Sequence, residues 1–251
     1  MRLHNKVVIV TGAGSGFGEG IAKRFAAEGA KVIVNDLNLG GATRVAAEIT
    51  DRGDLAQVCT GDVSRDADVA ALVRFAEQAY GRLDVVVNNA GITHRNQPLL
   101  EVSEDEFDRI FQVNVKSLFL TARYAVPVFR KQGGGCFVNI ASTAGVRPRP
   151  GLVWYNGSKG AVITISKTMA LELAPDKIRV NCINPVAGDT PLLASFMGED
   201  TPARRAQFIA SIPLGRFSQP RDIANAALFL ASADADFVTG VSLEVDGGRC
   251  V

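Results

Sequence analysis

Two side chains in the stretch WYNGSKGAV, residues 154–162, are spaced for acid–base chemistry. Tyr155 and Lys159 are four residues apart, so on a helix they share one face. Free tyrosine has a pKa of about 10 and is a poor base at neutral pH, but a neighbouring ammonium favours the phenolate and lowers that pKa. The pair therefore predicts proton transfer by Tyr155, tuned by Lys159.

Two further polar residues could complete this site. Ser142 follows the apolar run at 135–141, where an α/β sheet places its ligand crevice, and its hydroxyl could hold a substrate oxygen against Tyr155. Asn114 interrupts an apolar helical pattern, and such a polar residue needs a buried partner or a function. We therefore treat both as candidates for the same site.

A glycine-rich turn, TGAGSGFG at 11–18, follows the first apolar run of the chain. Without side chains, the backbone of such a turn can approach a diphosphate, and the N–H groups at a helix start can bind it. Asp36 lies about 20 residues further on, where a carboxylate can accept hydrogen bonds from ribose hydroxyls. A carboxylate repels a 2′-phosphate, position 15 is Ser, and positions 35 and 37 are not basic. The pattern predicts NAD, with NADP less favoured.

The elements that must position these residues alternate between short β-branched runs and longer helical patterns. The runs are near-continuous rather than alternating, which indicates strands buried on both faces. This rhythm predicts the α/β class: a single doubly wound (Rossmann) domain over residues 1–251, with about seven parallel strands and helices on both faces. The expected strands are 6–10, 31–35, 55–59, 83–88, 135–141, 178–183 and 241–245, and the expected helices are 16–28, 41–52, 66–79, 104–131, 155–173 and 221–231.

Two local features break this rhythm. Residues 187–212 belong to a connection too long for an ordinary loop, so we expect a lid over the substrate there. The helix from 155 begins among residues that form helices poorly, including Gly157 and Gly160. We expect these small residues, with Ser158, to let the helix lie close against the cofactor or a neighbouring element.

Composition argues against several other kinds of protein. The 27 basic and 26 acidic residues give a net charge of +1, which favours neither nucleic acid nor an anionic membrane as the main partner. No window resembles a membrane span or a signal peptide, so we expect a cytoplasmic protein. Four cysteines without a C-x-x-C pair and two histidines predict reduced thiols and no metal site. No G-x-S-x-G elbow points to a hydrolase.

Together these residues resemble the short-chain dehydrogenase/reductase family over essentially the whole chain. The resemblance implies an NAD(P)-dependent oxidoreductase that interconverts a secondary alcohol and a ketone by hydride transfer. It also implies a homotetramer, built partly through the helices near 104–131 and 155–173. The matching marks are T-G-x-x-x-G-x-G at 11–18, Asp62-Val63, N-N-A-G at 88–91, Asn114, Ser142, Y-x-x-x-K at 155–159, Thr190 and EVDGG at 244–248.

The resemblance implies a role for each residue of the catalytic group. Tyr155 would be the acid/base, and Ser142 would orient and polarise the substrate oxygen. Lys159 would bind the nicotinamide ribose and lower the tyrosine pKa, while Asn114 would hold a water that relays protons to Lys159.

The resemblance also implies a set of cofactor contacts. Asp62 would contact the adenine, Asn88 and Gly91 would line the adenosine side, and Thr190 would contact the carboxamide. The family commonly has Pro-Gly after the sixth strand, whereas this chain has Pro185-Val186, so we expect an altered backbone path and pocket wall there. The expected cofactor residues are Gly12, Ser15, Gly16, Phe17, Gly18, Asp36, Leu37, Asp62, Val63, Asn89, Ala90, Gly91, Tyr155, Lys159, Pro185, Val186, Gly188 and Thr190.

Several functions remain open at this point. The leading substrate is a small or cyclic alcohol or a sugar; the alternative is a 3-oxoacyl thioester, as in a reductase acting on acyl carrier protein. A catalytically silent dinucleotide sensor is a third possibility, which the intact catalytic group disfavours. His94-Arg95-Asn96 could contact the substrate or form an exposed loop, and Trp154 could line the pocket, although we favour packing for it.

Overall fold

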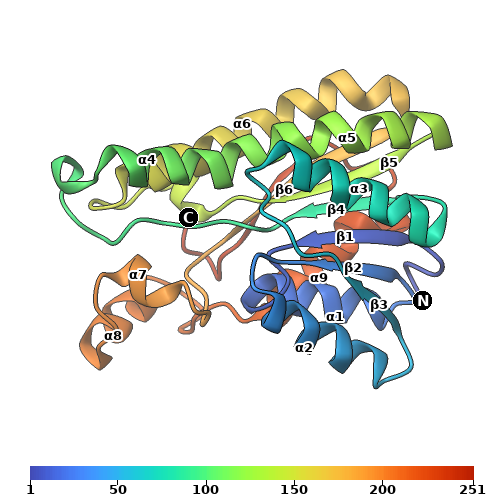
Figure 1. Ribbon diagram of the computed structural model, residues 1–251. Coiled ribbons are helices and arrows are strands. Elements are labelled where there is room, and N and C mark those ends of the chain that lie inside the picture. Colours follow the sequence, from blue (N-terminus) through green and yellow to red (C-terminus); the bar gives the residue numbers. More distant parts are fainter.

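The computed structural model describes residues 1–251 and contains the expected doubly wound sheet (Figure 1). All seven strands are parallel and lie in the order β3-β2-β1-β4-β5-β6-β7. The order reverses direction at β1, so the carboxyl ends of β1 and β4 open the crevice in which such sheets bind ligands. The strands are β1 Val7–Thr11, β2 Lys31–Asn35, β3 Leu55–Val58, β4 Val85–Asn88, β5 Gly135–Ile140, β6 Ile178–Pro185 and β7 Ser242–Val245.

Helices cover both faces of the sheet, and each face has its own apolar core (Figure 1). Successive residues of β1 point to opposite faces, so Val8 and Val10 join one core while Val7 and Ile9 join the other. One layer contains α1 Gly16–Ala26, α2 Leu39–Thr50 and α9 Pro220–Ala231, and the other contains α3 Asp66–Tyr80, α4 Glu104–Phe111, α5 Ser117–Gln132 and α6 Val153–Leu173. Short 3₁₀ turns lie at Leu99–Glu101, Thr143–Gly145, Ala174–Asp176 and Ala233–Ala235.

The expectation that every strand is buried on both faces is wrong at the two edges of the sheet. β3 exposes alternate residues, with Leu55 52% exposed, and β7 is only half buried. An edge strand has a neighbour on one side only, and the helices cover mainly the central strands. The two edge strands, β3 and β7, are therefore only partly buried.

The long helix expected over 104–131 is also not continuous. A π-helical segment, Gln112–Lys116, separates α4 from α5, and Asn114 lies at its centre. Single π-turns inside helices interrupt the regular hydrogen-bond ladder and often mark functional positions. The interruption allows the Asn114 side chain to turn inward, and this residue is 1% exposed.

The excursion at 187–212 forms two short helices, α7 Leu193–Met197 and α8 Pro202–Ala210, which lie together outside the two helical layers (Figure 1). An apolar cluster joins them to the end of β6. Val186 belongs to this cluster, so the side chain that stands where a glycine was expected packs against the excursion. The cluster comprises Val186, Leu193, Met197, Phe208, Ile212 and Phe217.

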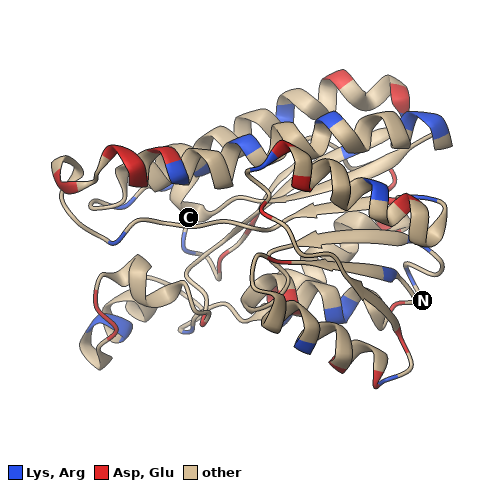
Figure 2. Cartoon of the chain, in the orientation of Figure 1, with Lys and Arg blue, Asp and Glu red and all other residues tan.

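Charged side chains are spread over both helical layers, with an acidic concentration at the start of α4 (Figure 2). No helix is long and apolar enough to cross a membrane. All four cysteines are free thiols, and no group of His, Cys, Asp or Glu side chains could hold a metal ion.

Candidate active site

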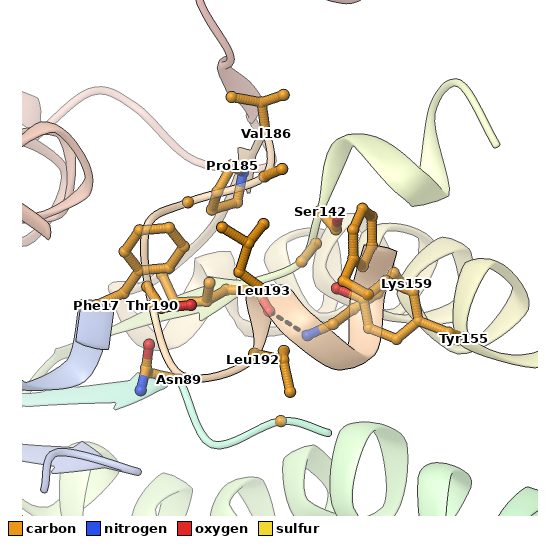
Figure 3. A pocket seen from close by; sticks show the side chains of 16 residues that line it. Phe17, Asn89, Ser142, Tyr155, Lys159, Pro185, Val186, Thr190, Leu192 and Leu193 are labelled. Atoms are coloured by element: carbon orange, nitrogen blue, oxygen red, sulfur yellow. Dashed lines mark hydrogen bonds between the residues drawn. The ribbon is translucent and has the colours of Figure 1, made fainter. Parts of the chain in front are cut away.

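A cavity of about 100 Å³ lies where the carboxyl ends of β4, β5 and β6 meet the excursion at 187–212 (Figure 3). Ser142, Tyr155 and Lys159 stand on one side of it, and Phe17, Asn89 and Thr190 stand on the other. The remaining lining residues are mostly apolar: Gly91, Ile140, Ala141, Pro185, Val186, Ala187, Gly188, Leu192, Leu193 and Phe196. We call this cavity the catalytic cavity.

Tyr155 and Lys159 share one face of α6, and both side chains are buried. The ammonium nitrogen of Lys159 lies 5.9 Å from the centroid of the Tyr155 ring. It donates a 2.8 Å hydrogen bond to the carbonyl of Ile140, the last residue of β5. The strand end therefore holds the lysine in place beneath the tyrosine.

The expectation that Lys159 lowers the pKa of Tyr155 stays a prediction, because burial and Ser142 are the influences on this pKa in the present arrangement. Burial raises the pKa of Tyr155, and only the hydrogen bond with Ser142 opposes this. Burial also lowers the pKa of Lys159 to about 8, since a low-dielectric site disfavours its charge. Burial thus moves the two titrations apart, with the lysine losing its proton before the phenol, and does not make the phenol acidic by itself.

Asn114 is held by the loop after β4. Its side-chain oxygen accepts a hydrogen bond from the Ile92 N–H at 2.8 Å, and its amide donates to the Ile92 carbonyl at 2.9 Å. The amide also donates to the Ser158 hydroxyl at 3.0 Å, and that hydroxyl donates to the Tyr155 carbonyl. Asn114 thereby connects the π-turn to the helix that carries Tyr155.

The space beside Gly91 connects Asn114 with Lys159. A Cβ atom placed on Gly91 would lie 3.2 Å from the Lys159 nitrogen and 3.3 Å from the Asn114 side-chain oxygen. The two polar atoms thus face the same small space. Such a space suits a water molecule that is hydrogen-bonded to both groups.

The close approach expected of α6 is real, but it depends on a different glycine. A Cβ on Gly145, in the turn after β5, would lie 2.7 Å from the Gly160 nitrogen and the Lys159 carbonyl carbon, closer than real Cβ contacts. Gly160 itself would meet nothing nearer than 3.8 Å, and Gly157 faces open space. The facing turn, rather than the helix, supplies the residue that must lack a side chain.

A second cavity, of about 220 Å³, lies at the ends of β1, β2 and the loop after β3. Gly91 borders both cavities, so they are neighbours along the sheet edge. Eight of the expected cofactor residues line it: Gly12, Ser15, Asp36, Leu37, Asp62, Val63, Ala90 and Gly91. Asn35, Gly61, Ile92, Arg109 and Val113 line it as well, and these were not predicted.

The Asp36 carboxylate fixes the backbone at this end. One oxygen accepts a hydrogen bond from the Gly14 N–H and the other from the Asn38 N–H, both at 2.8 Å. A carboxylate oxygen can accept more than one hydrogen bond, so both atoms keep capacity for a ribose hydroxyl. Nearby, Ser15 begins α1 without a side-chain cap, and the helix start therefore presents its N–H groups.

Asp62 is part of a small polar cluster. It accepts hydrogen bonds from the N–H and hydroxyl of Ser64 and from the Arg109 guanidinium at 3.1 Å. Burial raises the pKa of the Asp62 carboxyl, but these hydrogen bonds outweigh it and the pKa is lowered. Arg109 lies on α4, 47 positions away, and no local sequence signal connects it with Asp62.

The remaining predicted residues divide clearly. Gly16 and Gly18 lie in the first turn of α1 and line neither cavity. Gly188 leaves room for the Phe17 ring, because a Cβ there would lie 2.3 Å from that ring and displace it. Asn88 is buried, donates to Asn139 at 2.8 Å and lines neither cavity, so its expected place beside the adenosine is wrong.

His94 and Trp154 are placed by packing. His94 is 3% exposed, so the exposed-loop interpretation is wrong for this residue, although it does not line the catalytic cavity. The backbone N–H of Asn96, two residues on, donates to the Ser195 carbonyl in α7. Trp154 packs edge-on against Phe107 of α4, with ring centroids 5.2 Å apart, as the packing interpretation expected.

The residues of both cavities fit a nicotinamide dinucleotide. The uncapped start of α1 suits a diphosphate, the free lone pairs of Asp36 suit a ribose, and the two cavities meet at Gly91. The buried amine of Lys159 and the phenol of Tyr155 then stand at the end of the crevice where a reacting ring would lie. The donor set is that of a dinucleotide site and not of a metal site.

Comparisons with known proteins agree with this geometry. The family model described as enoyl-(acyl carrier protein) reductase matches residues 12–249. A 4-formylbenzenesulfonate dehydrogenase of Comamonas testosteroni is 54% identical over 250 residues, covering 99% of each chain. A 3-oxoacyl-(acyl-carrier-protein) reductase of Thermotoga maritima is 40% identical and covers 100% of both chains. The crystal structure of a 3-ketoacyl-(acyl-carrier-protein) reductase from Brucella melitensis complexed with NADH has a TM-score of 0.93 and 49% identity, covering 99% of this chain and 100% of that one.

The chain belongs to the short-chain dehydrogenase/reductase family. It is an oxidoreductase of that family, which uses a nicotinamide dinucleotide and acts on alcohols or the corresponding carbonyl compounds.

Proposed function

We propose that this protein is an NAD-dependent dehydrogenase in which Tyr155 exchanges the proton of a substrate hydroxyl. The observation that carries the proposal is the pair of adjoining cavities. One contains Tyr155 with Ser142 and Lys159, and the other contains Asp36, whose charge opposes a 2′-phosphate. No cation other than Arg109 lines the second cavity, and Arg109 is paired with Asp62.

Each residue of the catalytic group has a task in this proposal. The cofactor, when bound, accepts or supplies the hydride and brings a positive charge in its oxidised form. Ser142 holds the substrate oxygen, and Tyr155 takes its proton during oxidation or returns it during reduction. Lys159 binds the nicotinamide ribose, and Asn114 holds a water beside Gly91 through which the proton passes to Lys159.

The wall of the catalytic cavity favours a substrate whose carbinol carbon carries small, apolar or aromatic groups. Phe196 of the lid packs edge-on against Tyr155, with ring centroids 5.7 Å apart, and Leu192, Leu193 and Val186 complete the wall. The relative that is 54% identical is named for an aromatic formyl compound, which supports aromatic alcohols and aldehydes as the first substrates to test, beside small or cyclic secondary alcohols.

A 3-oxoacyl thioester is the second candidate substrate. Two of the relatives described above are reductases of such thioesters, one of them solved with NADH. The packed lid and the small catalytic cavity favour a compact substrate over a long acyl chain. A panel of benzylic and cyclic alcohols with NAD, set beside acetoacetyl thioesters with NADH, separates the two possibilities.

The decisive variant is Tyr155→Phe. We expect turnover to fall by a factor of about 10³ or more, because the proton has no donor or acceptor, while NADH binding measured by fluorescence stays within about twofold. Tyr80→Phe, in α3 away from both cavities, is the matched control. Full activity in Tyr155→Phe, or a higher catalytic efficiency with NADP in the unaltered protein, would overturn the assignment.

We also propose that the chain forms a homotetramer through α5 and α6. Two large apolar side chains of these helices face solvent, Phe119 at 59% and Leu171 at 80% exposure. Their burial between subunits would remove apolar surface from water. Light scattering should give the mass of four chains, and Leu171→Glu should reduce it.

A further inference from the structure

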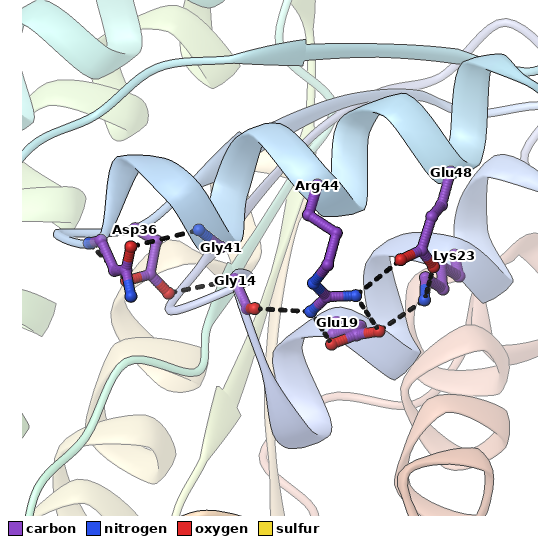
Figure 4. Close-up of polar contacts among 8 residues, drawn as sticks. Gly14, Glu19, Lys23, Asp36, Gly41, Arg44 and Glu48 are labelled. Atoms are coloured by element: carbon purple, nitrogen blue, oxygen red, sulfur yellow. Dashed lines mark hydrogen bonds and ion pairs between the residues drawn. The ribbon is translucent and has the colours of Figure 1, made fainter.

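Four charged side chains form a closed cluster beside the glycine-rich turn (Figure 4). Glu19 and Lys23 come from α1, and Arg44 and Glu48 come from α2. Arg44 donates to Glu19 at 2.6 and 3.0 Å and to Glu48 at 2.7 Å, while Lys23 donates to both carboxylates. The two cations and two anions cancel, so the cluster carries no net charge.

The cluster touches the residue that Asp36 also holds. The Gly14 N–H donates to Asp36, and the Gly14 carbonyl accepts a 3.1 Å hydrogen bond from the Arg44 guanidinium (Figure 4). Arg44 and Asp36 therefore bind the same residue, Gly14, and Asp36 is the carboxylate expected to meet the adenosine ribose. Its position suits a guanidinium that contacts a 2′-phosphate, a group that arginine binds strongly.

Arg44 is not available for that contact in this structure. Its guanidinium makes four hydrogen bonds, three of them to the carboxylates of Glu19 and Glu48. Hydrogen bonds from Arg44 and Lys23 lower the pKa of Glu19, although burial raises it, so this carboxylate stays charged at neutral pH. Glu19 and Glu48 thus occupy the guanidinium and balance its charge.

From this geometry we propose that Glu19 and Glu48 are specificity-determining residues, which hold Arg44 away from the adenosine ribose and so help Asp36 to exclude NADP. The inference rests on the proposed use of NAD. It adds that this chain already has the arginine that an NADP-binding form would need. The preference for NAD over NADP then depends on the pairing of Arg44 with Glu19 and Glu48 as well as on Asp36 at the end of β2.

The test is the double variant Glu19→Gln, Glu48→Gln. Glutamine has the same shape and can still accept from Arg44, so the turn keeps its bracing while two negative charges are lost. We expect the dissociation constant of NADPH, measured by fluorescence titration, to fall about fivefold, the upper end of the range for an exposed ion pair. That of NADH should change less than about twofold, and the gain should shrink at high salt.

Two further variants isolate the cause. Adding Arg44→Gln to the double variant should return NADPH binding to its original value, because the freed guanidinium is then gone. Asp51→Asn, at the far end of α2 and outside the cluster, removes a similar charge and should leave both dissociation constants unchanged. Thermal melts of all variants check that the fold is kept.

The outcomes separate this inference from the proposed function. If the double variant weakens both dinucleotides equally, or leaves NADPH binding unchanged, the cluster only braces the turn and the inference is overturned. If the unaltered protein binds NADPH more tightly than NADH, or binds neither, the proposed use of NAD fails instead.

Discussion

Lys159 stands one helical turn beyond Tyr155, yet its ammonium donates its hydrogen bond to the Ile140 carbonyl and not to the phenol. The two groups are coupled through space, at 5.9 Å from nitrogen to ring centroid. Burial moves their pKa values in opposite directions, upward for the tyrosine and downward to about 8 for the lysine. The protein thus prepares a lysine that can exchange protons near neutral pH and leaves most of the tyrosine activation to its hydrogen-bond partners and to the bound cofactor.

Replacement of Ser142 tests that view. The Ser142 hydroxyl is the group that lowers the pKa of Tyr155 against burial. In Ser142→Ala the phenol loses this support, so the rise of alcohol oxidation with pH should move to higher pH, and kcat/KM should fall by about 10²-fold. Profiles of kcat/KM from about pH 6 to about pH 10, at saturating cofactor, measure both effects. Ser142→Thr keeps the hydroxyl and should keep the profile; an unshifted profile in Ser142→Ala would contradict the assignment.

Lys159→Met should stabilise the protein while it removes activity. The pKa of Lys159 is about 8 when folded and 10.5 in its usual state, so its buried charge destabilises the fold fully below pH 8. Between these values the unfolded chain binds more protons, and the penalty disappears as pH rises. The substitution also removes the hydrogen bond to Ile140. We therefore expect the free energy of unfolding to rise by about 2 kcal/mol at pH 7, and this gain should shrink toward pH 10.

Urea denaturation of Lys159→Met at the two pH values measures this gain. Lys167→Met is the control, since Lys167 is exposed on the same helix two turns further on and should change stability little. Equal effects of the two substitutions, or a loss of stability at pH 7, would show that the buried charge of Lys159 carries no penalty.

Much of this architecture follows from the sequence because it rests on local patterns. The β-branched runs and the glycine-rich turn identify the strands, the first helix and Asp36 without tertiary information. The edge strand β3 differs because burial depends on neighbours in space, as Leu55 shows. The π-turn at Asn114 also escapes prediction, because the hydrogen bonds of this side chain go to Ile92, 22 positions away.

The same reason limits what the sequence says about the site. The four catalytic candidates lie near one another: Ser142 follows β5, while Tyr155 and Lys159 share a face of α6. Lys159 contacts the last residue of β5, and Asn114 faces the same small space as Lys159. Arg109 and Gly145 were missed because each matters only through a partner distant in sequence: Asp62 for the arginine and α6 for the glycine. Val186 departs from the expected glycine already in the sequence, but its place in the apolar cluster with α7 and α8 depends on packing.

Asn114→Leu should destabilise the fold. The substitution keeps the approximate volume but leaves the Ile92 N–H, the Ile92 carbonyl and the Ser158 hydroxyl without the partner they have now. Unpaired buried polar groups cost about 1–3 kcal/mol each, so we expect a loss of about 3 kcal/mol after partial relaxation. Urea denaturation measures it, with Gln112→Leu, exposed in the same π-turn, as the control. A loss no greater than that of the control would mean that these hydrogen bonds do not hold the turn.

Arg149 should control how firmly α8 is attached to the rest of the protein. Its guanidinium stacks on the Phe208 ring of α8, 4.4 Å from the centroid, and donates to the Ser211 hydroxyl at 2.9 Å. Phe208 in turn contacts Phe196, which packs against Tyr155. Arg149 thus attaches α8 to the loop before α6, and through the two rings it supports the wall of the catalytic cavity.

Arg149→Ala removes this attachment while the sheet and its two cores stay intact. We expect trypsin to cleave α8 at Arg204 and Arg205 about five- to tenfold faster. Local opening of α8 then no longer has to overcome the cation–π contact and the charged hydrogen bond of Arg149. The KM for substrate should rise, and the melting temperature should move little because the lid lies outside the main cores. Arg147→Ala is the matched control, since Arg147 is exposed and bonded only to the Arg249 carbonyl. If cleavage accelerates only in step with a drop in global stability, or equally in both variants, Arg149 does not attach the lid.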